Sequence, residues 1–293
     1  MISGFENKTI NVSELNLATW NKGNGTPILL LHGYPQSSYM WRYIAPELAK
    51  THQVILVDLP GYGKSQGPVP DEANYAYSKR NLAKILVELM TRLGHERFQV
   101  LGHDRGARVG FRMCLDYPDK VTAYCALDIV PTLSVWDNMD WKNAMGTYHW
   151  PFLAQPAPMP ETLIKAEPDH YMEHIFARWA DDRSQLAPEA IEKYKTQFRS
   201  NNVIAASCAD YRSGATTDVE HDRQDQKKGS KIQCPVLVIY GSGFLKNMAD
   251  APRKEWEPWA DNLKDLQLSC GHFVAEEAPE ECMPAILEFF KHN

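Results

Sequence analysis

The 293-residue chain lacks an apolar run long enough to cross a bilayer, which argues against a membrane-spanning helix. Residues 1–20 mix Glu6, Lys8 and Glu14 with apolar side chains, so they lack the hydrophobic core of a signal peptide. We therefore expect a cytoplasmic protein. Internal repeats and low-complexity tracts are also missing, and the length suits one domain with an insertion.

Positive charge is scarce. The chain has 31 Lys and Arg against 37 Asp and Glu, a formal net charge of −6. Nucleic acids and anionic membranes favour partners with clustered Lys and Arg. We therefore expect neither as the main partner, and a small molecule is the expected ligand.

Metal-ligand spacing is absent as well. The six cysteines are scattered, with no Cys-x-x-Cys pair and no Cys/His spacing, and several lie within apolar runs. They are Cys114, Cys125, Cys208, Cys234, Cys270 and Cys282. We expect buried free thiols and no metal site.

Apolar residues make up 44% of the chain, enough for a sizeable core. Continuous apolar runs at 28–31 and 54–57 are typical of strands covered on both faces. Residues 121–127 predict another strand, and residues 82–93 have the spacing of an amphipathic helix. The remaining pattern predicts a hairpin at 9–20, a strand at 235–240, a helix at 253–263, a short strand at 266–268 and a helix at 279–291. This order predicts the α/β class with a parallel sheet.

Strand patterns disappear between Pro131 and Ser213, where Trp, Tyr, Met and Pro occur in helix-like stretches. The sequence therefore predicts a helical cap over 131–213, inserted into a core domain made of 1–130 and 214–293. The polar segment 218–231 is interpreted as a solvated surface path back to the core.

One local motif suggests catalysis. Gly102-His103-Asp104-Arg105-Gly106 lies between the apolar run 98–101 and a helical pattern that Pro118 ends. It has the form Gly-x-nucleophile-x-Gly of a strained strand-to-helix elbow, in which glycines allow close packing and the central side chain projects from the sheet. Asp104 stands in the nucleophile's place. Alone, the motif also fits an ordinary turn whose Asp caps the helix.

Three more motifs complete a pattern. They are His32-Gly33-Tyr34-Pro35, Asp58-Leu59-Pro60-Gly61-Tyr62-Gly63-Lys64-Ser65 and Gly271-His272-Phe273. Over essentially its whole length the chain resembles the α/β-hydrolases that carry a cap, and more narrowly the fluoroacetate dehalogenases. The resemblance implies an α/β-hydrolase fold: a mostly parallel eight-stranded sheet, flanked by helices, with an inserted helical cap.

The resemblance also implies the catalytic residues. Asp104 is the expected nucleophile, His272 the general base, and the backbone N–H groups of Tyr34 and Arg105 the donors of an oxyanion hole. For the acid that orients His272 we choose Asp128, which follows the strand 121–127. Many relatives place this acid after the penultimate strand, but there the chain has no carboxylate before Asp250, whose contribution stays open.

Arg105 and Arg108 are three residues apart at a helix start, so they project from one face beside Asp104. We interpret them as a clamp for a small carboxylate. An arginine beside the nucleophile would also keep it ionised. The competing interpretation is a pair of surface ion-pairing residues.

In the cap, His149, Trp150 and Tyr211 could supply three hydrogen-bond donors. The resemblance implies that such residues hold the departing halide. Aromatic packing within the cap is an equally good interpretation of Trp150 alone.

The expected reaction is the hydrolysis of haloacetates, with fluoroacetate giving glycolate and fluoride through an aspartyl ester. No cofactor is needed, and the resemblance implies a homodimer. One alternative is an epoxide hydrolase with the same nucleophile, in which Tyr211 would protonate the oxygen. Another is a non-catalytic protein that binds small carboxylates on this scaffold.

Overall fold

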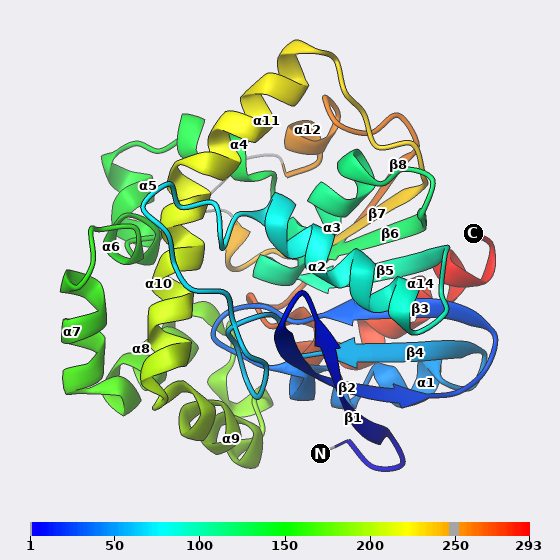
Figure 1. The fold of residues 1–293 in the computed structure, drawn as a ribbon, viewed down its shortest axis with the longest axis horizontal. Coiled ribbons are helices and arrows are strands. Elements are labelled where there is room, and N and C mark those ends of the chain that lie inside the picture. The colour runs from blue at the N-terminus through cyan, green and yellow to red at the C-terminus, as the bar shows by residue number, and fades with distance from the viewer. Residues whose placement is uncertain (1, 246–251) are drawn as a thin grey trace.

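An eight-stranded sheet forms the centre of the structure (Figure 1), a computed structural model that describes residues 2–245 and 252–293. The strand order is β1-β2-β4-β3-β5-β6-β7-β8. The strands are β1 (Glu6–Val12), β2 (Leu15–Lys22), β3 (Thr26–Leu31), β4 (His52–Val57), β5 (Phe98–His103), β6 (Val121–Leu127), β7 (Val236–Gly241) and β8 (Leu263–Leu268). Only the β1–β2 and β2–β4 pairs are antiparallel. The predicted mostly parallel eight-stranded sheet is confirmed.

The middle of the sheet consists of the apolar runs that the sequence pattern selected. Residues 28–31 of β3 and 54–57 of β4 are completely buried and pair in parallel register. A strand that is apolar at every position needs cover on both faces, and helices supply it. Helices α2 (Lys79–Arg92) and α3 (Asp104–Asp116) lie over one face, and α1 (Ala45–Leu48) and α14 (Pro279–Lys291) over the other (Figure 1).

Between β6 and β7 the chain forms only helices, consistent with the loss of strand patterns there. They are α4 (Thr132–Asp137), α5 (Trp141–Gly146), α6 (His149–Leu153), α7 (Met159–Ala166), α8 (Pro168–Trp179), α9 (Pro188–Phe198), α10 (Asn201–Ala215) and α11 (Thr217–Lys227). Helices α5–α8 lie to one side of the sheet, and α10 runs between α5–α7 and the sheet (Figure 1). Because α10 continues to Ala215, the expected boundary at 213 falls inside a helix, and the domain division stays a prediction.

The interpretation of 218–231 as a solvated path is wrong for one face of the segment, while Glu220, Arg223, Lys227 and Lys228 are exposed as expected. Most of it forms α11, and Asp218, Asp222 and Asp225 are buried. These acids are spaced by four and three residues, so they lie on one face of the helix. Asp222 accepts from Arg112 Nη2 over 2.5 Å, and Asp225 also pairs with Arg112. Partners distant in sequence explain how this charge run tolerates burial.

The C-terminal part differs from its prediction in one element. The helix expected over 253–263 is the shorter α12 (Pro252–Trp256), and β8 begins at Leu263. The short helix α13 (Val274–Glu277) then precedes α14. Asp250 lies outside the described residues.

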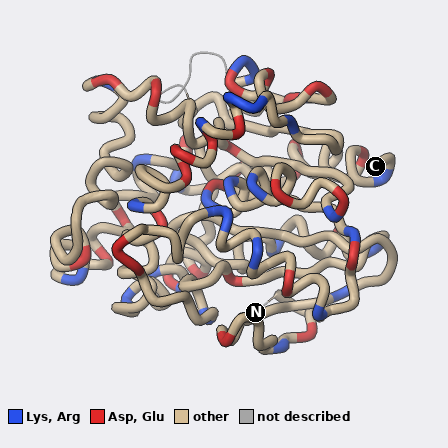
Figure 2. Tube along the Cα trace, turned by 45° about the horizontal axis from the view of Figure 1, so that its top comes forward, with Lys and Arg blue, Asp and Glu red and all other residues tan. Residues whose placement is uncertain are grey.

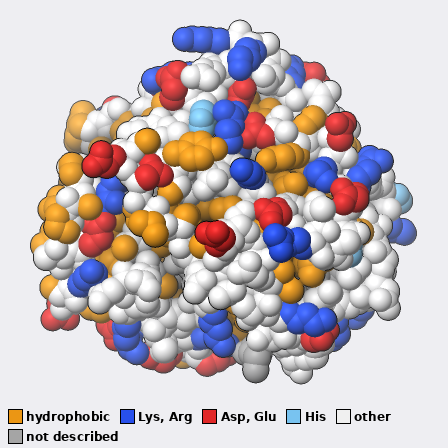
Figure 3. Space-filling view, viewed as in Figure 1, with side chains coloured by type: hydrophobic (Ala, Val, Ile, Leu, Met, Phe, Trp, Pro, Cys, Tyr) orange, Lys and Arg blue, Asp and Glu red, His pale blue; other side chains and the backbone are white. Residues whose placement is uncertain are grey.

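Charges of both signs are interspersed along the chain trace (Figure 2). Hydrophobic side chains reach the surface along the side formed by the cap helices (Figure 3). The most exposed large apolar residues of this region are Trp141, Met145, Met159 and Leu163. Among the described helices, none combines the length and apolarity needed to cross a membrane.

Candidate active site

Asp104 occupies the sharp turn from β5 into α3. Its φ is +42°, a left-handed conformation that costs energy for a residue with a side chain. The flanking glycines make the turn possible. A Cβ at Gly106 would collide with the carbonyl oxygens of Leu31 and His32, and one at Gly102 would lie 2.6 Å from Ala107 Cα. The elbow is therefore built as its motif predicts.

The Asp104 carboxylate is 6% exposed and accepts a hydrogen bond from the Tyr34 backbone N–H, with 2.9 Å from N to Oδ2. Burial alone would raise its pKa, but interactions with His272 and Arg105 outweigh burial, so the pKa lies below its ordinary value. An ionised carboxylate is the form that can act as a nucleophile.

His272 is held by Asp128. The distance from His272 Nδ1 to Asp128 Oδ2 is 2.6 Å, and Asp128 Oδ1 accepts from the Gly241 N–H over 2.8 Å. Burial raises the pKa of Asp128, and the Gly241 hydrogen bond opposes that rise. Burial lowers the pKa of His272 to about 4, so its imidazole is neutral near pH 7. Its Nε2 is buried without a partner among the described residues, as a general base requires.

The two arginines are buried but not equivalent. Arg105 donates to Asp210, a residue to which the sequence analysis gave no role, through Nε over 3.1 Å and Nη2 over 2.7 Å. Arg108 donates through Nη1 to neutral oxygens, Val130 O at 2.9 Å and Thr132 Oγ1 at 3.1 Å. Within the described part of the chain, Arg105 Nη1 and Arg108 Nε have no partner. Each arginine thus keeps at least one buried donor atom available.

His149 and Trp150 of α6 meet Tyr211 of α10. The Tyr211 ring centroid lies 5.7 Å from that of His149 and 5.8 Å from that of Trp150, and all three side chains are buried. The guanidinium carbon of Arg105 is 4.2 Å from the Tyr211 centroid, and that of Arg108 is 4.7 Å from the Trp150 centroid. The residues expected to bind the substrate carboxylate are therefore adjacent to those expected to bind the halide.

Burial lowers the pKa of His149 well below its ordinary value, so this imidazole is also neutral. Its Nδ1 has no partner within the described residues. A neutral imidazole beside the two arginines can donate one hydrogen bond without adding further positive charge.

Trp179, at the end of α8, is a site residue to which the sequence analysis gave no role. Its ring centroid lies 4.4 Å from that of His149 and 5.2 Å from that of His272, and its carbonyl accepts the His272 N–H over 2.8 Å. Trp179 therefore connects His272, the proposed base, to the proposed halide cradle, which consists of His149, Trp150 and Tyr211. A lone tryptophan in a helical segment gives no sequence signal for such a contact.

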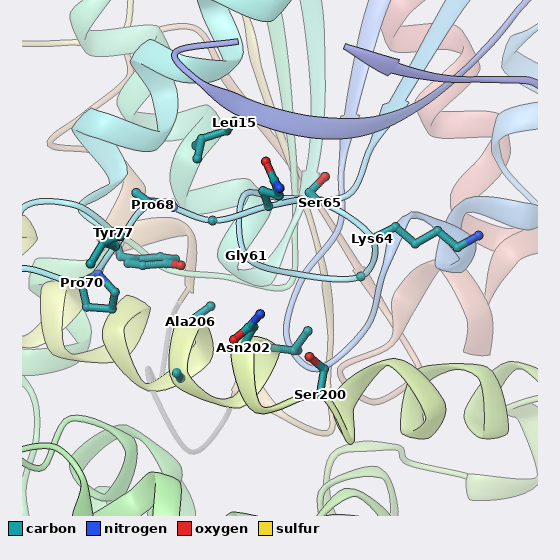
Figure 4. A pocket seen from close by; sticks show the side chains of 16 residues that line it. Leu15, Gly61, Lys64, Ser65, Pro68, Pro70, Tyr77, Ser200, Asn202 and Ala206 are labelled. Atoms are coloured by element: carbon teal, nitrogen blue, oxygen red, sulfur yellow. The ribbon is translucent and has the colours of Figure 1, made fainter. Parts of the chain in front are cut away.

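A separate groove of about 550 Å³ opens between the loop after β4 and helix α10. Figure 4 shows Gly61, Ser65 and Pro68 of that loop facing Asn202 and Ala206 of α10. Its described lining includes none of the candidate catalytic or binding residues. The groove is thus distinct from the cluster around Asp104.

These features define the class of protein. A family model for the α/β-hydrolase fold matches residues 26–279, and the chain belongs to this family. It is a hydrolase of this fold.

Individual relatives narrow the comparison. A fluoroacetate dehalogenase from Burkholderia sp. is 41% identical over 292 residues, which cover 99% of this chain and 95% of that protein. A soluble epoxide hydrolase from Corynebacterium sp. strain C12 is 31% identical over 272 residues, covering 92% and 91%. A solved structure of an α/β-hydrolase protein from Nostoc sp. PCC 7120 is 43% identical, covers 100% of both chains and superposes with a TM-score of 0.96.

Proposed function

We propose that the protein is a haloacetate dehalogenase that converts fluoroacetate and water into glycolate and fluoride. One observation carries the proposal: the ionised Asp104 lies among two arginines that each keep at least one unpaired donor and three buried rings that can donate hydrogen bonds. A small anion that carries a leaving group matches this set of partners. The 41% identity to a fluoroacetate dehalogenase supports the same substrate class.

In the first step, Arg105 and Arg108 bind the substrate carboxylate. Asp104 attacks the adjacent carbon through Oδ1, because Oδ2 is bound to the Tyr34 N–H. The carbon–halogen bond breaks, and the halide leaves with its electron pair. Three donors at roughly 1.5–3 kcal/mol each would accelerate this departure by several powers of ten.

In the second step, His272 Nε2 removes a proton from water, which attacks the ester carbonyl carbon of Asp104. Asp128 orients the ring and stabilises its protonated form. The backbone N–H groups of Tyr34 and Arg105 are proposed to hold the oxyanion. Collapse of the intermediate breaks the bond between the Asp104 carbonyl carbon and the ester oxygen. The protonated His272 returns its proton to that oxygen, which leaves as the hydroxyl of glycolate, and the remaining proton passes to solvent, so that the Asp104 carboxylate and the neutral imidazole are restored.

The test combines a fluoride electrode with substrates of three kinds. Fluoroacetate and chloroacetate should release halide, styrene oxide should stay intact, and Asp104→Asn should abolish release. In water enriched in heavy oxygen, one catalytic cycle should label the protein and leave the new glycolate hydroxyl unlabelled. Label appearing directly in glycolate, with none in the protein, would remove the ester from the mechanism.

An epoxide hydrolase is the second candidate. The 31% identity to a soluble epoxide hydrolase favours it, and the Tyr211 hydroxyl could protonate an epoxide oxygen. Against it, the ring beside Tyr211 is the indole of Trp150, which cannot protonate an epoxide oxygen. Two buried arginines also suit an anion better than a neutral epoxide. Epoxide opening without halide release would reverse this ranking.

A homodimer remains a further proposal. The four exposed apolar side chains on the cap, named above, provide a surface of the kind that subunit interfaces cover. Light scattering after size-exclusion chromatography measures the mass directly, and a monomer at micromolar concentration would contradict the proposal.

A further inference from the structure

Asp210 of α10 is completely buried and precedes Tyr211 of the proposed halide cradle. Arg105 donates to its carboxylate through Nε and Nη2, and Nη2 also donates to its backbone oxygen over 2.9 Å. Because the guanidinium group is planar, three bonds to one residue fix its orientation. Only Nη1 is left without a partner within the described residues.

A second cation supports Asp210 from behind. Lys79 Nζ pairs with Asp210 Oδ1, and the Tyr62 hydroxyl donates to Oδ2 over 2.8 Å. Lys79 Nζ also lies 3.3 Å from Asp218 Oδ2. Burial alone would raise the pKa of Asp210, but Arg105 and Lys79 outweigh it and hold the pKa far below its ordinary value. Arg105 and Lys79 therefore hold Asp210 in its charged form.

The two arginines consequently differ in charge balance. The charge of Arg105 is opposed by Asp210 in direct contact. Arg108 is bound to a carbonyl and a hydroxyl oxygen, and no described carboxylate forms an ion pair with it. Burial and the neighbouring Arg105 lower the pKa of Arg108 to about 10.

Building on the proposed dehalogenase function, we propose that Asp210 is a positioning residue that balances the charge of Arg105 and orients its guanidinium group. Arg105 then contributes one aimed hydrogen bond, while Arg108, which forms no ion pair with a described carboxylate, contributes the charge that selects an anionic substrate. Asp210 acts only through Arg105.

Gly214, one helical turn after Asp210, has a matching role. A Cβ at this position would lie 3.1 Å from Arg105 Nη2, closer than an ordinary contact. Because Asp210 holds the guanidinium group at three points, the group cannot move away without losing a bond. The helix thus combines a residue that holds Arg105 with a residue that leaves space for it.

The substitution Asp210→Asn distinguishes a positioning role from a purely electrostatic one, because the two roles predict opposite changes in substrate binding. Removing a negative charge beside an anion site should strengthen substrate binding if only charge matters. If Asp210 positions Arg105, the KM for chloroacetate should rise and kcat/KM should fall roughly 30-fold or more. An unchanged or lower KM with normal kcat overturns the proposal.

A double-mutant cycle tests whether the effect passes through Arg105. Asp210→Asn combined with Arg105→Gln should be no worse than Arg105→Gln alone, because the group to be oriented is already gone. Additive losses overturn the proposal. Glu161→Gln is the matched control: it removes a carboxylate paired with Arg212 of the same helix and should leave chloroacetate kinetics unchanged.

Direct binding of acetate, measured by calorimetry, gives a readout that does not depend on turnover. Weaker acetate binding to Asp210→Asn supports the positioning role, whether or not the wild-type protein releases halide. Absence of halide release by the wild-type protein would reject only the dehalogenase function. If Asp210→Asn does not fold, Gly214→Ala replaces it, since alanine favours the helix and removes no charge. Gly214→Ala should weaken acetate binding, and unchanged affinity overturns the proposal.

Discussion

Asp128 Oδ2 lies 2.6 Å from His272 Nδ1, whereas His272 Nε2 has no partner among the described residues. The imidazole is therefore fixed at one nitrogen and open at the other. In the proposed mechanism this arrangement is needed for hydrolysis of the ester but not for its formation.

Asp128→Asn should therefore stop the reaction halfway. We expect turnover to fall by about 10⁴-fold, since an asparagine no longer stabilises the protonated ring. The first halide should still be released in one equivalent per site, and the protein should gain the mass of a carboxymethyl group. Rapid-quench halide assays and intact-protein mass spectrometry measure both. Equal slowing of the halide burst and of turnover would contradict the assignment.

The activity should change with pH only far from neutrality, on both the acid and the alkaline side. His272 acts as a base only when neutral, and its pKa is about 4, so ester hydrolysis should be lost as the pH falls through about 4. Arg108 holds the substrate only when charged, and its pKa is about 10, so kcat/KM should fall above about pH 10. Stopped-flow measurements of both half-reactions check this, and an acid limb near 6.5 would show that His272 is not desolvated as described.

Acid should also destabilise the fold, because the buried histidines take up protons more readily in the unfolded chain. Burial lowers the pKa of His103 and His272 to about 4, and that of His149 well below its ordinary value, whereas in the unfolded chain all three take up protons near 6.5. Their contribution to stability is complete above about pH 6.5 and is lost as the pH falls, by about 1.4 kcal/mol per histidine and pH unit. Asp128 and Asp222 oppose part of this loss, because burial raises their pKa values in the folded state. Urea unfolding at pH 7, 6 and 5 measures the slope, and a flat profile would contradict it.

The cradle of rings should matter most for fluoride. Fluoride is the halide that loses the strongest hydration on entering a closed site, so it depends most on replacement donors. Tyr211→Phe should reduce fluoroacetate turnover by roughly 10- to 100-fold, the equivalent of one hydrogen bond to a charged acceptor. Bromoacetate turnover should change less. Equal losses for the two substrates would show that Tyr211 acts by packing rather than by holding the halide.

Sequence reasoning succeeded where the signal is local. The elbow, the buried runs of β3 and β4 and the glycine-flanked Asp104 depend on neighbours within a few residues, so pattern and spacing were enough. The eight strands and the gap between β6 and β7 follow from the same kind of evidence, together with the family resemblance.

Sequence reasoning failed for buried charged residues whose partners are distant in the sequence. Asp210 is adjacent to Tyr211 in the sequence, but its partners Arg105 and Lys79 come from other helices. Helix α11 was misread for the same reason, because its acidic face is buried against Arg112. Trp179 contacts His149 and His272 only through tertiary packing.

The single hydrogen bond from the Tyr34 N–H to Asp104 Oδ2 makes the two carboxylate oxygens inequivalent. If this contact persists through the cycle, Oδ2 is retained for the lifetime of the protein, while the opposite oxygen departs with each product molecule and is renewed from the medium. During prolonged turnover in water enriched in heavy oxygen, labelling of the protein would then stop at one Asp104 oxygen per subunit. Exchange of the second oxygen would report how often the carboxylate rotates between cycles.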